Sequence, residues 1–398
     1  MRIALLLLLA CTALPSQAQR ARDLGLPMEG VAGPLNAITD VAGIEVGFTT
    51  LIEGEGLVEV GKGPVRTGVT AIFPRGKAGV TDPVFGAWFS LNGNGEMTGT
   101  TWIEESGFVE GPVLITNTHS VGVARDAVIA WMVREGHLDG DFMMPVVAET
   151  YDALNDINGQ HVTTQHALDA MDAAAAGSVA EGNVGGGTGM ICHQFKGGTG
   201  TASQVVSIGF DRYTVGVLVQ CNYGGRSQLR IAGVPVGREM QDPRICWDHT
   251  ELPRAGSRAP LCSETGYAPD EDRGSIIIVL ATDAPFLPHQ LKRLVTRASL
   301  GVGKMGGIGG NSSGDIFLAF STANPEAGFG RASRDLSMLP NEFMNPFFQA
   351  AIWAVEEAII NAMLAAESMT GADYLHVPAL PHDRLIEVMK QYGRCPDC

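Results

Sequence analysis

The segment that most constrains this 398-residue chain is a charged loop that runs, without a turn, into an apolar strand. Asp270 to Arg273 are charged, Gly274 and Ser275 follow, and residues 276–280 read Ile-Ile-Ile-Val-Leu. A continuous apolar run of this length between charged or turn-forming residues is typical of a buried strand. If the Gly274–Ser275 peptide bond broke, Ser275 would become a new N-terminus at the end of that strand.

A free N-terminal serine would carry its nucleophile and its base on one residue. An α-amine titrates near ~7.7–8.0 in a model peptide, so at neutral pH it can accept the proton of its own hydroxyl group. Glycine before the serine allows backbone conformations that other residues avoid, which helps the hydroxyl attack the preceding carbonyl. The alternative is a Gly-Ser pair that merely enters a strand, so the rest of the chain has to distinguish the two.

The composition favours a globular, acidic protein. Apolar residues make up 45% and charged residues 18%, which is enough for a large core. The net charge of −16 becomes −17 when Arg2 leaves with the leader described below. Such acidity argues against nucleic acid or an anionic membrane surface as the partner.

Residues 1–18 have the pattern of a signal peptide. Arg2 precedes an apolar run over residues 3–10, and Ser16-Gln17-Ala18 supplies small residues before a cleavage point, so the mature chain would begin at Gln19. We therefore expect a periplasmic or secreted protein. The alternative is a lipid anchor on Cys11, because residues 8–11 loosely resemble a lipoprotein processing site. The apolar run is too short to span a bilayer, and no later segment has ~18 uninterrupted apolar residues, so we expect no integral membrane span.

Six cysteines follow the leader, and an even count in an exported protein permits disulfides. Cys246 with Cys262 would close a loop rich in proline and charge. Cys395 and Cys398 form a lone CxxC at the C-terminus, for which a small disulfide or two thiols are better explanations than zinc.

The hydrophobic patterns predict a layered α/β fold in one domain. Sheets inside and helices outside suit the order of elements better than a regular βαβ alternation. Residues 248–273 are expected to form a long exposed loop, and Asp283 is expected to be the N-cap of the helix that follows it. Strands are predicted at 37–41, 44–48, 68–73, 113–116, 204–209, 213–220, 275–281 and 316–321, and helices at 122–134, 164–176, 285–300 and 346–369.

Other sequence signals do not indicate a cofactor or a metal. The glycine-rich residues 184–189 lack the Gly-Lys-Ser/Thr ending of a phosphate-binding loop, so a structural role is favoured. His161 and His166 are five residues apart without the glutamate of a zinc-binding HExxH helix. The chain also lacks the Gly-x-Ser-x-Gly turn of a conventional serine hydrolase, and His119 in residues 117–120 is a weak signal by itself.

Seven spaced segments resemble one known family over nearly all of the mature chain. They are residues 22–25, 35–41, 91–97, 101–107, 274–277, 281–285 and 313–317. The chain resembles the family of L-aminopeptidase D-Ala-esterase/amidases and β-peptidyl aminopeptidases. The resemblance implies an αββα sandwich like that of N-terminal-nucleophile hydrolases. It also implies a precursor that cuts itself into residues 19–274 and 275–398, and a homo-oligomer of such processed pairs.

The resemblance also implies roles for single residues around the cut. Ser275 takes the position of the nucleophile, and Gly274–Ser275 that of the scissile bond. Ser313 corresponds to a second serine that hydrogen-bonds the nucleophile. Asp315 corresponds to an acidic residue that is glutamate in some members, and its shorter side chain leaves a structural role open.

Three further residues complete the expected site. Asn222 matches an oxyanion-stabilising asparagine, although it could instead cap a strand end. Tyr151 matches an active-site tyrosine, although it could be a half-buried core residue. We expect Glu149 to bind the ammonium group of the substrate because a carboxylate complements that charge, although it could be a solvated residue at a helix start.

Together these residues predict an exported, self-cleaving serine aminopeptidase without cofactor or metal, acting on a small peptide or amino-acid amide. Two alternatives remain: an acyltransferase that passes the acyl group to an amine, and a non-catalytic exported binding protein. The sequence does not distinguish L-, D-alanyl and β-amino-acid substrates.

Overall fold

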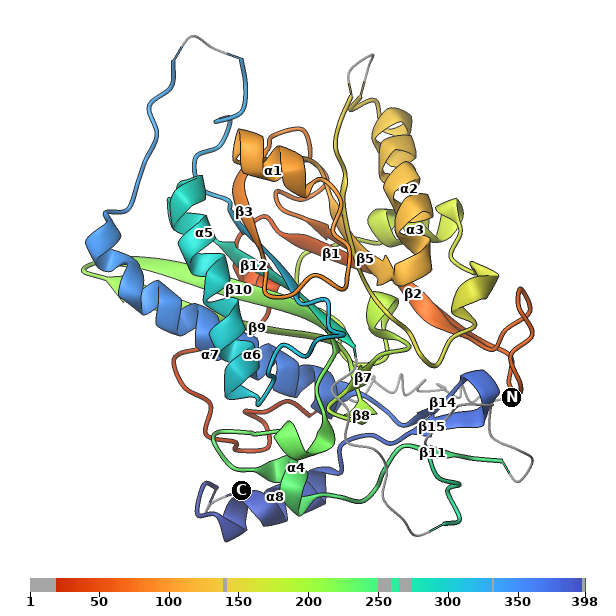
Figure 1. Cartoon of the computed structure of the whole chain (residues 1–398). Helices are drawn as coiled ribbons and strands as arrows, with labels where there is room; N and C mark the ends of the chain where they lie inside the picture. Colours follow the sequence, from red (N-terminus) through yellow and green to blue (C-terminus); the bar gives the residue numbers. More distant parts are fainter. Residues whose placement is uncertain (1–18, 139–141, 250–258, 265–273, 331–332, 396–397) are drawn as a thin grey trace, which may run out of the picture.

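A computed structural model describes residues 19–138, 142–249, 259–264, 274–330, 333–395 and 398 (Figure 1). The expected signal peptide, residues 1–18 with Cys11, lies outside the described residues, as do residues 270–273 of the charged loop.

Two β-sheets form the centre of the protein. The first has four strands in the order β1 (Glu45–Glu53), β2 (Val65–Phe73), β5 (Val113–Asn117) and β6 (Val146–Thr150). The second has six strands in the order β4 (Phe108–Val109), β3 (Val84–Ser90), β13 (Ile316–Ser321), β12 (Ser275–Thr282), β10 (Asp211–Asn222) and β9 (Gly198–Ile208).

Strand β12 is central in the six-stranded sheet and is apolar on both faces. Ile277 and Val279 pack between the two sheets, whereas Ile276 and Ile278 pack against the outer helices. Because successive strand residues point to opposite faces, only a continuous apolar run can fill both spaces. The apolar run after Ser275 therefore places that serine at the end of a central, buried strand.

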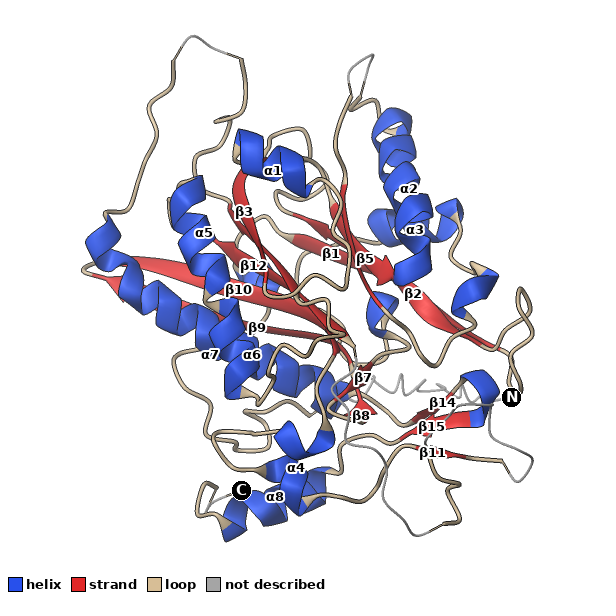
Figure 2. Ribbon diagram, viewed as in Figure 1, coloured by secondary structure: helices blue, strands red, loops and turns tan. Residues whose placement is uncertain are grey.

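Helices cover the outer face of each sheet (Figures 1 and 2). Helices α2 (Val121–Arg134) and α3 (Thr164–Asp172) pack on the four-stranded sheet. Helices α5 (Pro288–Thr296), α6 (Ala298–Lys304) and α7 (Met344–Ala365) pack on the six-stranded sheet. With one core between the sheets and one beneath each helical layer, the predicted αββα sandwich is confirmed.

Helix α7 is a core helix of this sandwich. Over the part of the chain that the structure describes, the helical stretch Asn341–Ala365 alone is long and apolar enough to cross a membrane, with mean hydropathy 1.3. However, 83% of that window is buried inside the protein, as expected for a helix that packs on a sheet.

Smaller elements surround the sandwich. The remaining helices are α1 (Thr100–Ser106), α4 (Val236–Glu239) and α8 (His382–Gln391); the remaining strands are β7 (Ile191–Cys192), β8 (Phe195–Lys196), β11 (Cys246–Trp247), β14 (Met369–Thr370) and β15 (Leu375–Val377). Strands β7 and β8 form a two-stranded hairpin of their own.

The described residues form three disulfides. The predicted Cys246–Cys262 bond is confirmed, and the terminal CxxC forms the Cys395–Cys398 bond. The third, Cys192–Cys221, was not expected from the sequence because its two cysteines lie 29 residues apart on different strands.

Several element boundaries differ from the sequence prediction. Residues 37–41 form a short 3-10 helix, Ile38–Asp40, instead of a strand. The Asp40 carboxylate accepts the backbone N–H groups of Leu35 and Ala37, and such local side-chain bonds compete with strand pairing. The sequence analysis did not predict strands β3, β4 and β6 of the two large sheets, nor the short strands β7, β8, β11, β14 and β15.

The helix predicted at 285–300 is two helices, α5 and α6, separated at Arg297, and its predicted N-cap is wrong. Leu287 is the N-cap, and Asp283 instead accepts the backbone N–H of Thr214 at 2.7 Å. Helix α3 ends at Asp172 instead of residue 176, and α7 ends at Ala365 instead of residue 369.

Candidate active site

Ser275 and Asn222 meet where two central strands end. Ser275 is the first residue of β12, Asn222 is the last residue of β10, and the antiparallel register pairs them directly. Both are nearly buried, with 5% and 4% of their surface exposed. The strand pairing alone therefore places the predicted nucleophile beside the predicted oxyanion amide.

Gly274 has a conformation that another residue cannot adopt at this place. Its φ is +132°, and a Cβ added to it would lie 1.8 Å from the carbonyl oxygen of Asn222 and 3.2 Å from Asn222 Nδ2. The absence of a side chain thus lets the Gly274–Ser275 bond lie directly against the Asn222 residue.

The hydroxyl of Ser275 contacts the loop before β13. Ser275 Oγ accepts the backbone N–H of Gly314 at 3.1 Å. On either side of Gly314, Ser313 Oγ donates to Asp315 Oδ1 at 2.5 Å, and both of these side chains are buried. The structure therefore brings Ser313 and Asp315 next to Ser275, while the expected direct bond between the two serines stays a prediction.

Asn92 holds the Asp315 side of this cluster and was not predicted. Its Oδ1 accepts the Asp315 backbone N–H at 2.6 Å, and its Nδ2 donates to Asp315 Oδ2 at 3.3 Å. Asn92 lies in residues 91–97, a segment that carried the family resemblance, so the signal was available but was not assigned to the site.

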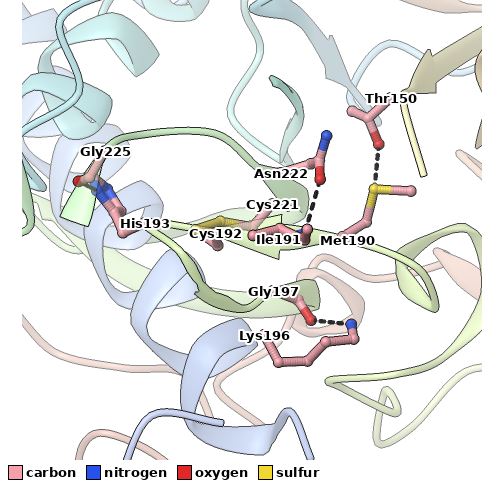
Figure 3. The surroundings of a disulfide bond; sticks show 10 residues. All are labelled: Thr150, Met190, Ile191, Cys192, His193, Lys196, Gly197, Cys221, Asn222 and Gly225. Carbon is pink, nitrogen blue, oxygen red and sulfur yellow. Dashed lines mark hydrogen bonds between the residues drawn. A yellow bond between two sulfur atoms is a disulfide. The ribbon is translucent and has the colours of Figure 1, made fainter. Parts of the chain in front are cut away.

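The side-chain amide of Asn222 is held at both ends. Its Nδ2 donates to the carbonyl oxygen of Tyr151 at 2.9 Å. Its Oδ1 accepts the backbone N–H of Ile191 at 2.8 Å, a bond that Figure 3 shows. The second bond defines which end of the amide is the donor. Ile191 was not predicted, because a backbone N–H on a distant strand leaves no sequence signal.

Glu149 is a buried carboxylate near the end of β6, with 2% of its surface exposed. Its Oε1 accepts the backbone N–H of Glu96 at 2.9 Å, and its Oε2 accepts the hydroxyl of Thr118. Burial raises the pKa of Glu149, and the bonds from Thr118 and Glu96 oppose this shift. Thr118 was missed because residues 117–120 were considered only for their histidine.

A cavity of about 810 Å³ joins these groups. Ser275, Glu149 and Tyr151 are all in its wall, and Tyr151 is the exposed one at 49%. Asn222, Ser313 and Asp315 are buried and do not line it. The complete lining is Gly93, Asn94, Gly95, Glu96, Thr118, Glu149, Tyr151, Gly274, Ser275 and Ser312.

This arrangement suits acyl transfer on a substrate that carries a positive charge. A hydroxyl group and an amide donor lie together, and a carboxylate shares the same cavity. Within the described ranges, no group of three or more His, Cys, Asp or Glu residues is placed to hold a metal ion.

Comparison with known proteins gives a consistent result. The model of peptidase family S58 matches residues 36–377. A β-peptidyl aminopeptidase, BapA, from Sphingosinicella microcystinivorans is 53% identical over 390 residues, which cover 97% of this chain and 96% of the relative.

Solved structures agree with this match. The L-aminopeptidase D-Ala-esterase/amidase from Ochrobactrum anthropi, described as a prototype of the serine aminopeptidases and a variant of the Ntn hydrolase fold, superposes with a TM-score of 0.84 at 50% identity. The match covers 95% of this chain and 99% of that one. A β-aminopeptidase from a Burkholderia species gives 0.81 at 43% identity, covering 94% and 99%.

Proposed function

The chain belongs to peptidase family S58 and is a peptide-bond hydrolase with an Ntn-hydrolase-like fold, and we propose that it is an exported serine aminopeptidase that cuts itself at Gly274–Ser275. The observation that carries the proposal is the register pair of Ser275, in the wall of the cavity, with the buried Asn222. It supports a site in which a hydroxyl nucleophile and an oxyanion donor would act on a substrate bound in that cavity.

The first reaction is the cut itself. Ser275 Oγ attacks the carbonyl carbon of Gly274, the amide C–N bond breaks, and the hydroxyl proton is transferred to the leaving nitrogen, which becomes the new α-amine. Water then hydrolyses the resulting ester, which leaves residues 19–274 with a new carboxylate and residues 275–398 with a free Ser275. The positive φ of Gly274 supports this step, because without a side chain Gly274 lies directly beside Asn222, whose Nδ2 is the proposed oxyanion donor.

Turnover repeats the same chemistry on a substrate. The α-amine of Ser275 accepts the hydroxyl proton while Oγ attacks the first carbonyl of the peptide, and Asn222 Nδ2 donates to the developing oxyanion. The amine then returns the proton to the leaving peptide, and water hydrolyses the acyl-enzyme. Ser313 and Asp315 hold Gly314, whose N–H contacts the nucleophile.

Glu149 and Tyr151 would position the substrate. Glu149 is the buried carboxylate of the cavity, so it can pair with the N-terminal ammonium group, and this pairing would restrict the enzyme to free N-termini. The exposed Tyr151 side chain would cover the bound residue. The substrate classes proposed here are L-amino-acid, D-alanyl and β-amino-acid peptides, amides or esters, and a panel of L-, D- and β-alanyl amides would rank them.

Export and assembly are also part of the proposal. Three disulfides support folding in an oxidising compartment, such as the periplasm or the outside of the cell. A lipid anchor on Cys11 is the alternative, and labelling with a radioactive fatty acid would detect it. A homo-oligomer of processed pairs would be tested by light scattering.

Ser275→Ala tests the function. The variant should remain one uncut chain without aminopeptidase activity, as seen on a denaturing gel, whereas the control Ser337→Ala at an exposed site should be cut like the wild type. A fully processed Ser275→Ala protein would remove Ser275 from the mechanism, and an intact, inactive wild type would favour a binding protein. Product analysis with and without an added amine would separate hydrolysis from acyl transfer.

A further inference from the structure

We propose that the Cys192–Cys221 disulfide is a positioning device for the side chain of Asn222, and that it thereby sets the rate of acyl transfer. The inference rests on the oxyanion role proposed above for Asn222.

The two cysteines flank the bond that orients the amide. Cys221 immediately precedes Asn222 on β10, and Cys192 immediately follows Ile191 on β7. The N–H of Ile191 donates to Asn222 Oδ1 at 2.8 Å, so the disulfide joins the two chain segments one residue away from this bond (Figure 3). Both cysteines are completely buried.

The same segment is also connected to the other end of the Asn222 amide. Met190, two residues before Cys192, accepts the hydroxyl of Thr150 through its Sδ at 2.7 Å (Figure 3). Thr150 precedes Tyr151, whose carbonyl oxygen accepts Asn222 Nδ2. One short segment therefore influences both ends of the Asn222 amide.

The hairpin that carries Ile191 has little pairing of its own. Strands β7 and β8 contain two residues each and form a separate two-stranded sheet. An isolated hairpin is marginally stable at best, so its position relative to β10 must come from other contacts. These contacts include the His193 N–H, which donates to the Tyr223 carbonyl oxygen at 2.7 Å, and the Arg226 guanidinium, which donates to the carbonyl oxygen of His193. The Cys192–Cys221 disulfide adds a covalent link between the hairpin and β10.

The positioning has a direct chemical consequence. An amide can rotate by half a turn and present its oxygen where its nitrogen should be. The Ile191 N–H prevents this, because it can pair with the oxygen but not with the NH₂ group. If the hairpin moves away, the amide keeps only the bond from Nδ2 to the Tyr151 carbonyl oxygen, and the donor points less reliably at the oxyanion.

The expected effect is on kcat and not on KM. The oxyanion exists in the transition state, whereas the substrate ammonium group is proposed to bind Glu149. Loss of an oxyanion donor costs on the order of 10²–10³ in kcat, so loss of its orientation alone should cost about 10-fold.

The experiment compares two disulfides in purified, processed protein. Cys192→Ala/Cys221→Ala should lower kcat about 10-fold, with KM within about twofold of the wild type. The control Cys246→Ala/Cys262→Ala removes a disulfide between cysteines 16 residues apart, one of which is on β11, away from Asn222. This control should leave kcat unchanged. Equal losses of kcat in both pairs would overturn the inference, as would free thiols at Cys192 and Cys221 in the active wild type.

A double-mutant cycle distinguishes positioning from general stability. In the cut fraction of the Asn222→Ala protein, removing Cys192–Cys221 should lower kcat by less than about twofold, because there is no amide left to orient. An undiminished 10-fold loss in that background would refute the inference. If Asn222→Ala itself keeps full activity, the proposed oxyanion role fails; if it loses activity while the cysteine pair does not, only the positioning role fails.

A second measurement covers the case in which the cysteine variant does not fold. Processed wild-type enzyme is treated with a phosphine reductant in mild denaturant, returned to native buffer under the reductant, and analysed by thiol alkylation and mass spectrometry. Activity should fall in parallel with labelling of Cys192 and Cys221, and not with labelling of Cys246 and Cys262. Full activity with both pairs reduced would contradict the proposal.

Discussion

Replacement of Gly274 by alanine should stop the chain from cutting itself. The added Cβ would lie 1.8 Å from the Asn222 carbonyl oxygen, whereas real Cβ atoms essentially never approach closer than 3.0 Å. The start of β12 or the end of β10 must therefore shift by about 1.2 Å, the difference between these values. The φ of +132° adds strain of about 1–3 kcal/mol for a residue with a side chain.

This shift falls on the two groups that react. Ser275 and Asn222 are the register pair at the strand ends, so moving one strand changes the position of the hydroxyl relative to the amide donor. A misplacement of about 1 Å can cost on the order of 10²-fold in rate. We expect the rate of chain cleavage in Gly274→Ala to fall at least about 100-fold.

The assay is a time course of newly made precursor on a denaturing gel, with intact masses of the products. Gly303→Ala is the matched control: Gly303 lies in helix α6, is exposed and has no atom near its added Cβ, so it should be cut normally. Gly274→Ala should still unfold in a cooperative transition, at a lower Tm than uncut Ser275→Ala because of the strain at this position, whereas a failure to fold would leave no transition. Cleavage of Gly274→Ala at the wild-type rate would refute the reasoning.

Two further predictions concern buried carboxylates. Glu149→Gln should raise KM about 10- to 100-fold with a small change in kcat, because a charge-assisted contact is lost. Burial raises the pKa of Glu149. In the wild type, KM should therefore rise on acidification at a higher pH than an exposed glutamate would give, and Glu149→Gln should not show this rise. An unchanged KM for Glu149→Gln in steady-state kinetics would exclude ammonium binding. Asp152 is completely buried, and burial raises its pKa from 3.8 to about 8, so the stability it contributes is present below pH 3.8 and is lost as pH rises through about 8. Asp152→Asn should therefore raise Tm at pH 9 more than at pH 5, and a variant less stable than the wild type at pH 9 would contradict this.

The candidate site was predictable to the extent that it depends on chemistry within a short segment. Ser275 was found because its glycine, its hydroxyl and the apolar run after it are adjacent in the sequence. Asn222, Ser313 and Asp315 followed from the resemblance, and the structure brings all three to the end of β12. The roles expected for these residues stay predictions.

Residues that act through long-range backbone contacts were not predicted. Ile191 contributes an N–H, which every residue except proline possesses, so its identity carries no information about its partner. Thr118 and Asn92 meet Glu149 and Asp315 only because separate strands end at the same edge. The Cys192–Cys221 pairing likewise depends on how a hairpin lies against β10.

The sequence of neighbouring residues determined that a serine follows a glycine at the start of an apolar strand, and that both faces of this strand must be buried. These properties depend on neighbouring residues, whose spacing is set by covalent geometry. Tertiary structure alone decided that Asn222 lies opposite Ser275, that the Asn222 amide is held from both ends, and that a buried carboxylate shares the cavity. The physical reason is that strand register and sheet order are chosen by packing of the whole core, which sums contributions from residues far apart in the chain.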